Sequence, residues 1–202
     1  MKKLLFFDID GTLVDDDGSI PASTIQAIAS AQKAGHLTFI NTGRTWGNVD
    51  PELRAIGFDG FICGCGTEII YRNQVLFHQQ VKPELCASIR ELVRSCNATP
   101  LYERSDTMFY DPIMPKHPAF CDLMKIYEQK QKDVQDLTDH ADFSFDKFVI
   151  WYDEQTDLKK FQDGIAADFD FIDRENGFAE MVPKNCSKAT GMQQLVDYLQ
   201  MD

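Results

Sequence analysis

The stretch KKLLFFDIDGTLV, residues 2–14, decides the fold of this chain. Its apolar residues 4–7 do not alternate with polar ones, which is typical of a strand buried on both faces of a parallel sheet. Asp8 and Asp10 follow at once, at the end of the strand where ligands bind in open α/β sheets. Gly11 lets the backbone turn sharply there. The stretch therefore predicts either a site with two carboxylates or a strand ending in an Asx-type turn.

The composition sets the broad class of the protein. The 202 residues allow one or two domains, and 44% hydrophobic with 26% charged residues is ordinary for a globular protein. The net charge of −12 argues against a nucleic-acid partner, because nucleic-acid phosphates attract basic surfaces. The apolar run before Asp8 is too short for a signal peptide or a membrane span. We therefore expect a cytoplasmic protein without a membrane partner, whose six cysteines are reduced thiols.

Strand and helix signals alternate over the first third of the chain. Residues 4–7, 37–40 and 61–63 are expected to form three strands separated by two helices. This order predicts parallel strands joined by right-handed crossovers. Residues 68–79 then form a plausible β-hairpin.

The two expected helices have start and stop signals. The first lies between Pro21 and Gly35, and Ile25, Ile28 and Ala29 are expected to form its buried face. The second, shorter helix begins after an aspartate at position 50, which is expected to be its N-cap.

The sequence pattern changes near residue 82. Helix and strand signals then follow in the order α-β-β-α-β-α-β-β, with Asn176-Gly177 a strong hairpin signal. This order predicts an α+β module with an antiparallel sheet, inserted at residues 82–182. The first domain is then formed by residues 1–81 and 183–202.

Three elements of the predicted first domain carry polar residues to one edge of its sheet. Asp8 and Asp10 follow the first strand, residues 42–44 (Thr-Gly-Arg) follow the second, and Lys188 begins the last helix after Ser187, its expected cap. A lysine in the first turn of a helix opposes the helix dipole. Its position therefore indicates a task such as anion binding, with a solvated lysine as the alternative.

This ordered set resembles motifs I, II and III of the haloacid dehalogenase (HAD) superfamily, mostly Mg²⁺-dependent phosphatases with an aspartate nucleophile. The stretch FAEMVPKNCSKATGMQQL, residues 178–195, is similar to the family's lead-in to its motif III lysine. The inserted module resembles the C2B cap of the Cof-type subfamily in order and position. The resemblance implies an α/β fold, with a Rossmann-like parallel-sheet core and an inserted α+β cap domain.

The resemblance also implies catalytic and metal-binding roles. Asp8 would be the nucleophile that forms an aspartyl-phosphate. Asp10 would protonate the leaving oxygen and later take a proton from water. Mg²⁺ would bind the Asp8 carboxylate and the Asp10 backbone carbonyl.

Phosphate-binding roles follow from the same resemblance. The Thr42 hydroxyl and the Gly43 amide would hold phosphoryl oxygens, whose charge Lys188 would neutralise. For Arg44 two roles stay open, a contact with the substrate or a salt bridge within the core.

The chain departs from the family pattern in two places. Cys65-Gly66 stands where members often carry Asn-Gly. Nothing after Lys188 resembles motif IV, a Gly-Asp-x-x-Asn-Asp type string that supplies further Mg²⁺ ligands. We therefore expect either a C-terminally incomplete core or a protein without that metal clamp. Residues 4–7 would then form an open sheet edge, which predicts self-association through that edge.

These features predict a HAD-type phosphoric monoester hydrolase of the Cof type. Its expected reaction is the Mg²⁺-dependent hydrolysis of a small phosphorylated metabolite such as a sugar phosphate. Two other functions stay open: a non-catalytic phosphometabolite-binding protein, or inactive fragment, and a phosphosugar mutase. Cap residues 104–106 and 174–176 are candidates for contacts with the substrate.

Overall fold

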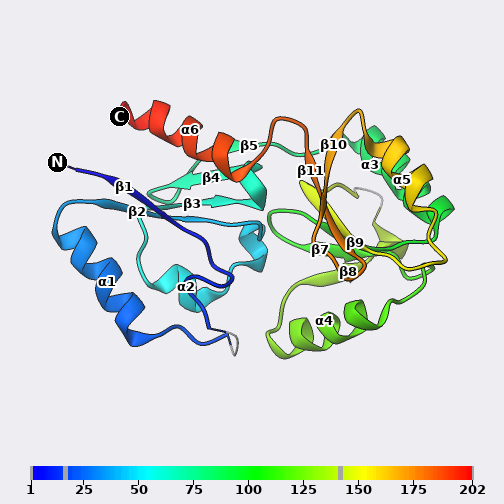
Figure 1. Ribbon diagram of the computed structural model, residues 1–202, viewed down its shortest axis with the longest axis horizontal. Coiled ribbons are helices and arrows are strands. Elements are labelled where there is room, and N and C mark those ends of the chain that lie inside the picture. Colours follow the sequence, from blue (N-terminus) through cyan, green and yellow to red (C-terminus); the bar gives the residue numbers. More distant parts are fainter. Residues whose placement is uncertain (1, 16–17, 141–142, 202) are drawn as a thin grey trace. The chain divides into compact units, whose positions relative to one another are not determined.

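The computed structural model of the chain describes residues 2–15, 18–140 and 143–201. The chain divides into two compact units (Figure 1). The first, which we call the core unit, comprises Met1–His78 and Cys186–Asp202, and the second, the inserted unit, comprises Gln79–Asn185. The inserted unit thus begins a few residues before position 82 and ends a few residues after position 182, the limits expected from the sequence.

The core unit is built on a five-stranded sheet with the strand order β1-β2-β3-β4-β5. Its elements are β1 (Leu4–Phe7), α1 (Ala22–Lys33), β2 (Leu37–Asn41), η1 (Trp46–Asn48), α2 (Pro51–Ala55), β3 (Gly60–Cys63), η2 (Gly64–Gly66), β4 (Glu68–Tyr71), β5 (Gln74–His78) and α6 (Lys188–Leu199). Strands β1, β2 and β3 are parallel, and β4 and β5 form an antiparallel hairpin. The predictions of three parallel strands and a following hairpin are confirmed.

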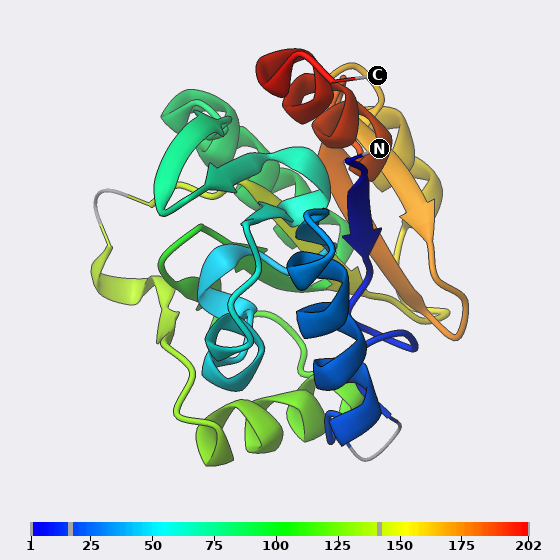
Figure 2. The same cartoon turned by 90° about the vertical axis from the view of Figure 1, so that its left-hand side faces the viewer.

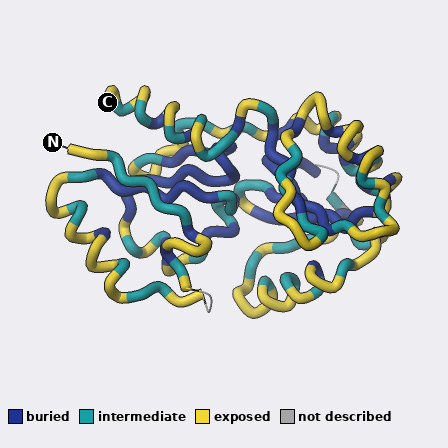
Figure 3. The backbone as a smooth tube through the Cα atoms, in the orientation of Figure 1, coloured by how far each residue is buried: buried dark blue, intermediate teal, exposed yellow. Residues whose placement is uncertain are grey.

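Helices cover both faces of the core sheet. In both views α1 and α2 lie on one face and α6 lies on the other (Figures 1 and 2). Ile28 of α1 and Leu53 of α2 belong to one buried cluster, whereas Leu195 of α6 belongs to a second cluster with Phe39. All five residues of β2 are buried, as a strand covered on both faces requires (Figure 3).

Strand β1 is less buried than the sequence predicts. Residues Leu4–Phe7 are half-buried rather than buried. Within the described residues β1 pairs only with β2, so one of its edges lacks a neighbouring strand. The expected sheet edge is therefore present, and self-association through it stays a prediction.

The predicted buried face of α1 is wrong in two of its three residues. Ile28 is buried, but Ile25 is 43% exposed and Ala29 is exposed. Gln32, one turn after Ile28, is half-buried, and its side-chain amide donates a hydrogen bond of 2.8 Å to the backbone carbonyl of Gly57. A polar residue can occupy the inner face when a carbonyl acceptor satisfies it, and apolar periodicity cannot detect this.

The inserted unit contains a six-stranded sheet in the order β10-β11-β9-β6-β7-β8. Its elements are α3 (Pro83–Cys96), β6 (Thr99–Glu103), β7 (Met108–Tyr110), α4 (Pro118–Gln129), β8 (Val134–Asp136), η3 (Leu137–Asp139), β9 (Lys147–Trp151), α5 (Leu158–Ile165), β10 (Phe169–Asp173) and β11 (Phe178–Pro183). Neighbouring strands are antiparallel except β7 and β8, which are parallel. The sequence order missed β8, because its three residues, Val-Gln-Asp, contain a single apolar side chain.

A cluster of four charged side chains lies on β6, β9 and β11 of the inserted unit and directly after β10. The side chain of Lys147 in β9 is 3% exposed, and its Nζ lies 3.6 Å from Glu103 Oε1 and 3.0 Å from Glu180 Oε2. Arg174 Nε donates to Glu180 Oε1 at 2.8 Å. The two positive and two negative charges balance, which is the condition under which charges are tolerated in a protein interior.

Two further expectations concern the whole chain. The six cysteines are free, as expected for reduced thiols. Among the described residues, no helix is long and apolar enough to cross a membrane.

Candidate active site

The ends of two parallel strands build the candidate site in the core unit. The register pairs Phe7 of β1 with Ile40 of β2, so the two strands end at the same level of the sheet. Asp8 follows β1 directly, and Thr42 follows β2 directly. The strand register therefore brings these strand-end residues to the carboxyl edge of the sheet, as the sequence predicts.

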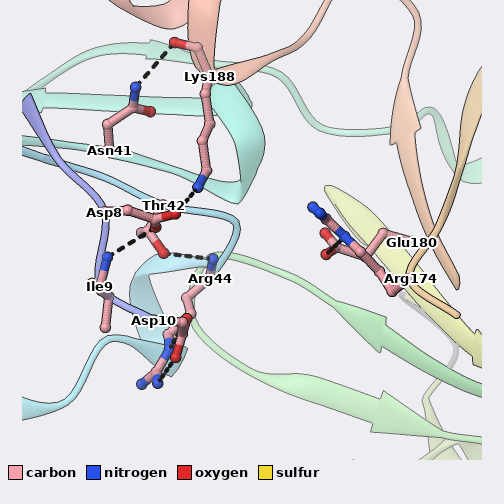
Figure 4. Close-up of polar contacts among 9 residues, drawn as sticks. All are labelled: Asp8, Ile9, Asp10, Asn41, Thr42, Arg44, Arg174, Glu180 and Lys188. Atoms are coloured by element: carbon pink, nitrogen blue, oxygen red, sulfur yellow. Dashed lines mark hydrogen bonds and ion pairs between the residues drawn. The ribbon is translucent and has the colours of Figure 1, made fainter. Parts of the chain in front are cut away.

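Lys188 and Asp8 form the central contact of the site (Figure 4). Lys188 Nζ lies 2.5 Å from Asp8 Oδ2, although 180 positions separate the two residues. The other carboxylate oxygen of Asp8 accepts a hydrogen bond of 2.8 Å from the backbone amide of Ile9. The side chains of Lys188 and Asp8 are 35% and 39% exposed, so a ligand can reach both.

The start of α6 explains why Lys188 lies at this position. Ser187 caps the helix: its hydroxyl accepts a hydrogen bond of 3.0 Å from the Thr190 amide. The Thr190 hydroxyl in turn accepts one of 2.8 Å from the Ser187 amide. This capping box fixes the first turn of α6, and with it the backbone of Lys188. The contact between Lys188 and a carboxylate favours the anion-binding interpretation over that of a solvated lysine.

Arg44 links two carboxylates of the core unit. Its Nη2 lies 2.6 Å from Asp10 Oδ1, its Nε donates to Asp10 Oδ2 at 3.2 Å, and its Nη1 lies 3.2 Å from Asp50 Oδ2. Burial lowers the pKa of the Arg44 guanidinium, but the hydrogen bond and the charge of Asp10 outweigh it, so this pKa is raised. Of the two roles left open for Arg44, the structure shows the salt bridge.

Asp50 does not have its expected role as a side-chain cap. It occupies the position before α2, but its side chain makes no capping hydrogen bond. Its carboxylate pairs with Arg44 instead. A charge-assisted bond to a guanidinium is stronger than a bond to a backbone amide, which explains the preference.

Thr42 and Gly43 lie in a loop that is held from several sides. Thr42 is fully buried, and its hydroxyl accepts a hydrogen bond of 3.2 Å from the Arg44 amide. The backbone amide of Cys65 donates to the Thr42 carbonyl at 3.0 Å, and that of Gly64 donates to the Arg44 carbonyl at 2.8 Å. The loop is therefore fixed by hydrogen bonds before any ligand binds.

The turn η2 supplies those hydrogen bonds in a left-handed conformation. Gly64, Cys65 and Gly66 have φ angles of 58°, 56° and 90°. Glycine and asparagine adopt this region at low cost, whereas a cysteine there is uncommon. Members of the family that the sequence resembles often carry Asn-Gly at this turn. The left-handed conformation gives a physical reason why that pair suits it.

Asn41 is a site residue that the sequence reasoning missed. It ends β2, is 5% exposed, and its side-chain nitrogen donates to the backbone carbonyl of Lys188 at 3.2 Å. The available signal was a polar amide at the end of a strand that is otherwise buried and mainly apolar.

The residues proposed as metal ligands fit Mg²⁺ in their donor chemistry. The Asp8 carboxylate and the Asp10 backbone carbonyl offer hard oxygen atoms, which Mg²⁺ prefers. The backbone amides that close the turn after β1 donate to the Ile9 carbonyl, which leaves the Asp10 carbonyl outside these bonds. Among the described residues there is no group of three or more His, Cys, Asp or Glu side chains that could hold a metal. The protein part of a Mg²⁺ site here would thus be small, which is usual for this ion.

The fold and the strand-end site define an α/β protein with a Rossmann-like core and a large insertion. Residues 5–202 match the family model of haloacid dehalogenase-like hydrolases, and the chain belongs to this family. The resemblance seen in the sequence is confirmed.

Curated relatives match along the whole chain. YkrA of Bacillus subtilis (strain 168) is named as a phosphatase. It is 29% identical over 206 residues, which cover 100% of this chain and 76% of YkrA. The HMP-PP phosphatase of Yersinia pseudotuberculosis (strain IP32953) is 25% identical over 211 residues, which cover 100% of this chain and 74% of that protein. The expected enzyme class, a HAD-type phosphatase, is confirmed.

A solved structure shares the fold. The HAD subclass IIB sugar phosphatase BT4131 superposes with a TM-score of 0.77 at 18% identity, covering 100% of this chain and 77% of that chain. The predicted fold class, a Rossmann-like α/β core carrying an insertion, agrees with this similarity.

Proposed function

We propose that this chain hydrolyses the phosphate monoester of a small metabolite through an aspartyl-phosphate formed on Asp8, with Mg²⁺ bound. The contact between Lys188 and Asp8 carries the proposal, because it sets a cation beside the expected nucleophile. The relatives' names point to small organic phosphates, namely HMP-PP and sugar phosphates. A sugar phosphate is therefore the substrate class that we propose.

The electrostatics of the attack explain why a lysine is needed. The Asp8 carboxylate and a phosphate ester are both anions, and at about 4 Å their repulsion is about 1 kcal/mol in water and about 4 kcal/mol near a protein surface. The Lys188 ammonium offsets this repulsion. Bound Mg²⁺, held by the Asp8 carboxylate and the Asp10 carbonyl, would supply further neutralisation of phosphoryl charge.

The covalent steps use the two aspartates in turn. An Asp8 carboxylate oxygen forms a bond to phosphorus while the bond to the ester oxygen breaks, and Asp10 gives that oxygen a proton. Water then attacks the aspartyl-phosphate, and Asp10 takes a proton from it. Inorganic phosphate leaves, and both carboxylates return to their starting state.

The proposed cycle would weaken the contact between Asp10 and Arg44 whenever Asp10 carries the proton. In the structure both carboxylate oxygens of Asp10 accept hydrogen bonds from Arg44. A protonated carboxyl is neutral and is a weaker acceptor than a carboxylate, so it holds the guanidinium less strongly. We infer that the Arg44 contact represents the resting state of the general acid.

The loop after β2 would hold the phosphoryl oxygens. The Thr42 hydroxyl accepts the bond from the Arg44 amide, so its own hydrogen stays available for a phosphoryl oxygen. The backbone amide of Gly43 is the second proposed donor, and Lys188 the third. Such preorganised donors stabilise the charge of the transferring group.

We also propose that the inserted unit is a C2B-type cap that selects the substrate. Its candidate residues already have partners within the unit: Arg104 Nε lies 2.5 Å from Asp106 Oδ1, and Arg174 lies 2.8 Å from Glu180. Binding of a ligand by these arginines would exchange one anionic partner for another.

A specific observation favours a second candidate function. The double contact of Asp10 with Arg44 occupies the general acid, as a non-catalytic phosphometabolite-binding protein would tolerate. Incubation of the chain with hexose phosphates and Mg²⁺ separates the possibilities. Release of inorganic phosphate supports the phosphatase, an isomeric ester indicates the mutase, and saturable binding without turnover indicates the binding protein.

A further inference from the structure

Asn41 connects the end of β2 to the first residue of α6. Its side-chain nitrogen donates a hydrogen bond of 3.2 Å to the backbone carbonyl of Lys188, a residue 147 positions away (Figure 4). The side chain is almost completely buried. The bond therefore joins the strand that carries the proposed phosphate-binding loop to the helix that carries the proposed phosphate-binding lysine.

Packing alone does not account for an asparagine at this position. Its Oδ1 atom is buried and has no hydrogen-bond partner among the described residues. A buried acceptor without a partner costs about 1–3 kcal/mol. The preceding strand residues Phe39 and Ile40 are apolar and fully buried, so an apolar side chain at position 41 would avoid this cost. The asparagine therefore has a role that an apolar side chain cannot fill.

The start of α6 is also confined from the side of η2 and β3. A Cβ atom on Gly66 would lie 2.4 Å from the Ser187 carbonyl oxygen, and one on Gly191 would lie 2.5 Å from Ile62 Cγ2. The first turn of α6 thus rests closely on the backbone of η2 and on β3. These contacts limit how near α6 comes, whereas the Asn41 hydrogen bond limits how far it can move away.

We propose that Asn41 is a positioning residue for Lys188. It fixes the backbone of Lys188 so that the ammonium lies at the Asp8 carboxylate and at the place of the phosphoryl group. The role rests on the proposed function, because phosphate is the anion that Lys188 would bind. Misplacing a charged group by a fraction of its contact distance is enough to weaken such an interaction.

Asn41→Leu is the decisive variant, because it keeps the number and branching of the side-chain heavy atoms, removes the hydrogen bond to Lys188, and removes the buried acceptor. We expect its free energy of unfolding in urea to equal or exceed that of the wild type. We expect its affinity for orthovanadate, measured by calorimetry with Mg²⁺, to fall about five-fold, the usual effect of one hydrogen bond. A merely structural role would lower stability and affinity together.

A double-mutant cycle tests whether Asn41 acts through Lys188. In a Lys188→Met background, Asn41→Leu should cause no further loss of vanadate affinity. Gln193→Leu is the matched control, since it removes a side-chain amide from α6 whose bond of 2.8 Å to Asp197 is exposed. It should leave the affinity unchanged. An unchanged affinity in Asn41→Leu, or an equal loss in both backgrounds, would overturn the proposal.

A second measurement decides the matter if the wild-type chain does not bind vanadate, an outcome that would count against the proposed function. The ¹³Cε signal of Lys188 can be followed by NMR in ¹³C-lysine protein and assigned with Lys188→Met. Its shift reports the contact with Asp8. Movement of this signal toward those of exposed lysines in Asn41→Leu supports the positioning role, and an unchanged signal in that variant contradicts it.

Discussion

Arg44 binds both carboxylate oxygens of Asp10, with Nη2 2.6 Å from Oδ1 and Nε 3.2 Å from Oδ2. The same guanidinium pairs with Asp50. This arrangement ties the proposed general acid to a residue of the loop after β2. We therefore expect Arg44 to affect the proposed chemistry through Asp10, rather than as a direct ligand of the phosphoryl group.

Arg44→Met tests this assignment. We expect vanadate affinity to stay within about two-fold of the wild type, because phosphoryl contacts are left in place, while the rate of hydrolysis changes. A direct substrate contact would instead cost about 2 kcal/mol or more, about thirty-fold in affinity. Asp50→Asn is the control, since it removes the second pair and keeps the contact with Asp10. A thirty-fold loss of affinity in Arg44→Met alone would restore the role of substrate contact.

Asp8→Asn should abolish hydrolysis and leave the fold intact. The amide is isosteric with the carboxylate but is a poor nucleophile, so no aspartyl-phosphate can form. Activity is measured with p-nitrophenyl phosphate, and folding by the urea unfolding curve. Retained turnover with an unchanged unfolding curve would exclude Asp8 as the nucleophile.

Lys188→Ala should weaken the binding of phosphate or vanadate by about 2 kcal/mol, the lower end for losing one partner of a charge contact, because both side chains are more than a third exposed. The loss should shrink as salt is added, because the contact is only partly buried and salt screens it. Titration calorimetry at two salt concentrations measures both effects. Equal affinities for the variant and the wild type would leave only the solvated-lysine interpretation.

The sequence predicts the parts of this fold in which local and global signals agree. The apolar run Leu4–Phe7 and the turn residues after it place β1 and its aspartates, and Ser187 places the start of α6. That Asp8 and Lys188 meet follows only from parallel topology and the family resemblance, because no local pattern links residues 180 positions apart. The inserted unit's strand β8 escaped detection because it is short and polar.

Side-chain partners are what the sequence could not supply. Gln32 replaces apolar residues on the inner face of α1 because a distant carbonyl accepts its hydrogen bond. Asp50 stays at the cap position but its side chain pairs with Arg44, and the side chain of Asn41 bonds to Lys188. Asn41 and Gln32 bind partners 147 and 25 positions away, and the Arg44–Asp50 pair, although only six positions apart, forms across a turn that no apolar periodicity reveals.

The charged cluster around Lys147 predicts a pH dependence of stability. Burial raises the pKa of Glu180, but the charge of Lys147, with further contributions from Arg174, outweighs burial, so this pKa is lowered from its ordinary value of 4.5. The native state then binds fewer protons than the unfolded state as the pH falls. The stabilisation is therefore complete above about pH 4.5 and is lost as the pH falls through the lowered pKa.

Glu180→Gln should reduce the loss of stability at acid pH. The free energy of unfolding, measured in urea at several values between about pH 3 and pH 7, should fall less steeply below pH 4.5 than in the wild type. Lys147→Met should lower stability by about 3 kcal/mol at neutral pH, since it removes the buried cation that lies between Glu103 and Glu180 while Arg174 still pairs with Glu180. If stability falls as steeply with acid pH in Glu180→Gln as in the wild type, this carboxylate is not the group that titrates.

Gly66→Ala should disturb both the fold and the phosphate site. Gly66 has a φ of 90°, which costs an alanine about 1–2 kcal/mol, and the added Cβ would lie 2.4 Å from the Ser187 carbonyl oxygen. The backbone at the start of α6 has to move, because the obstacle is not a flexible side chain. We expect a loss of about 2–4 kcal/mol in the free energy of unfolding and about ten-fold weaker vanadate binding.

Gly35→Ala separates the conformational cost of a positive φ from the steric effect of the added Cβ. Gly35 has a φ of 88°, but a Cβ there would meet nothing within 4 Å. It should therefore show only the conformational cost, about 1–2 kcal/mol, with unchanged vanadate affinity. If the two variants lose equal stability and both retain full affinity, the close approach of η2 to α6 has no part in placing Lys188. A loss of affinity confined to Gly66→Ala would show that the phosphate site depends on the spacing between this turn and the helix.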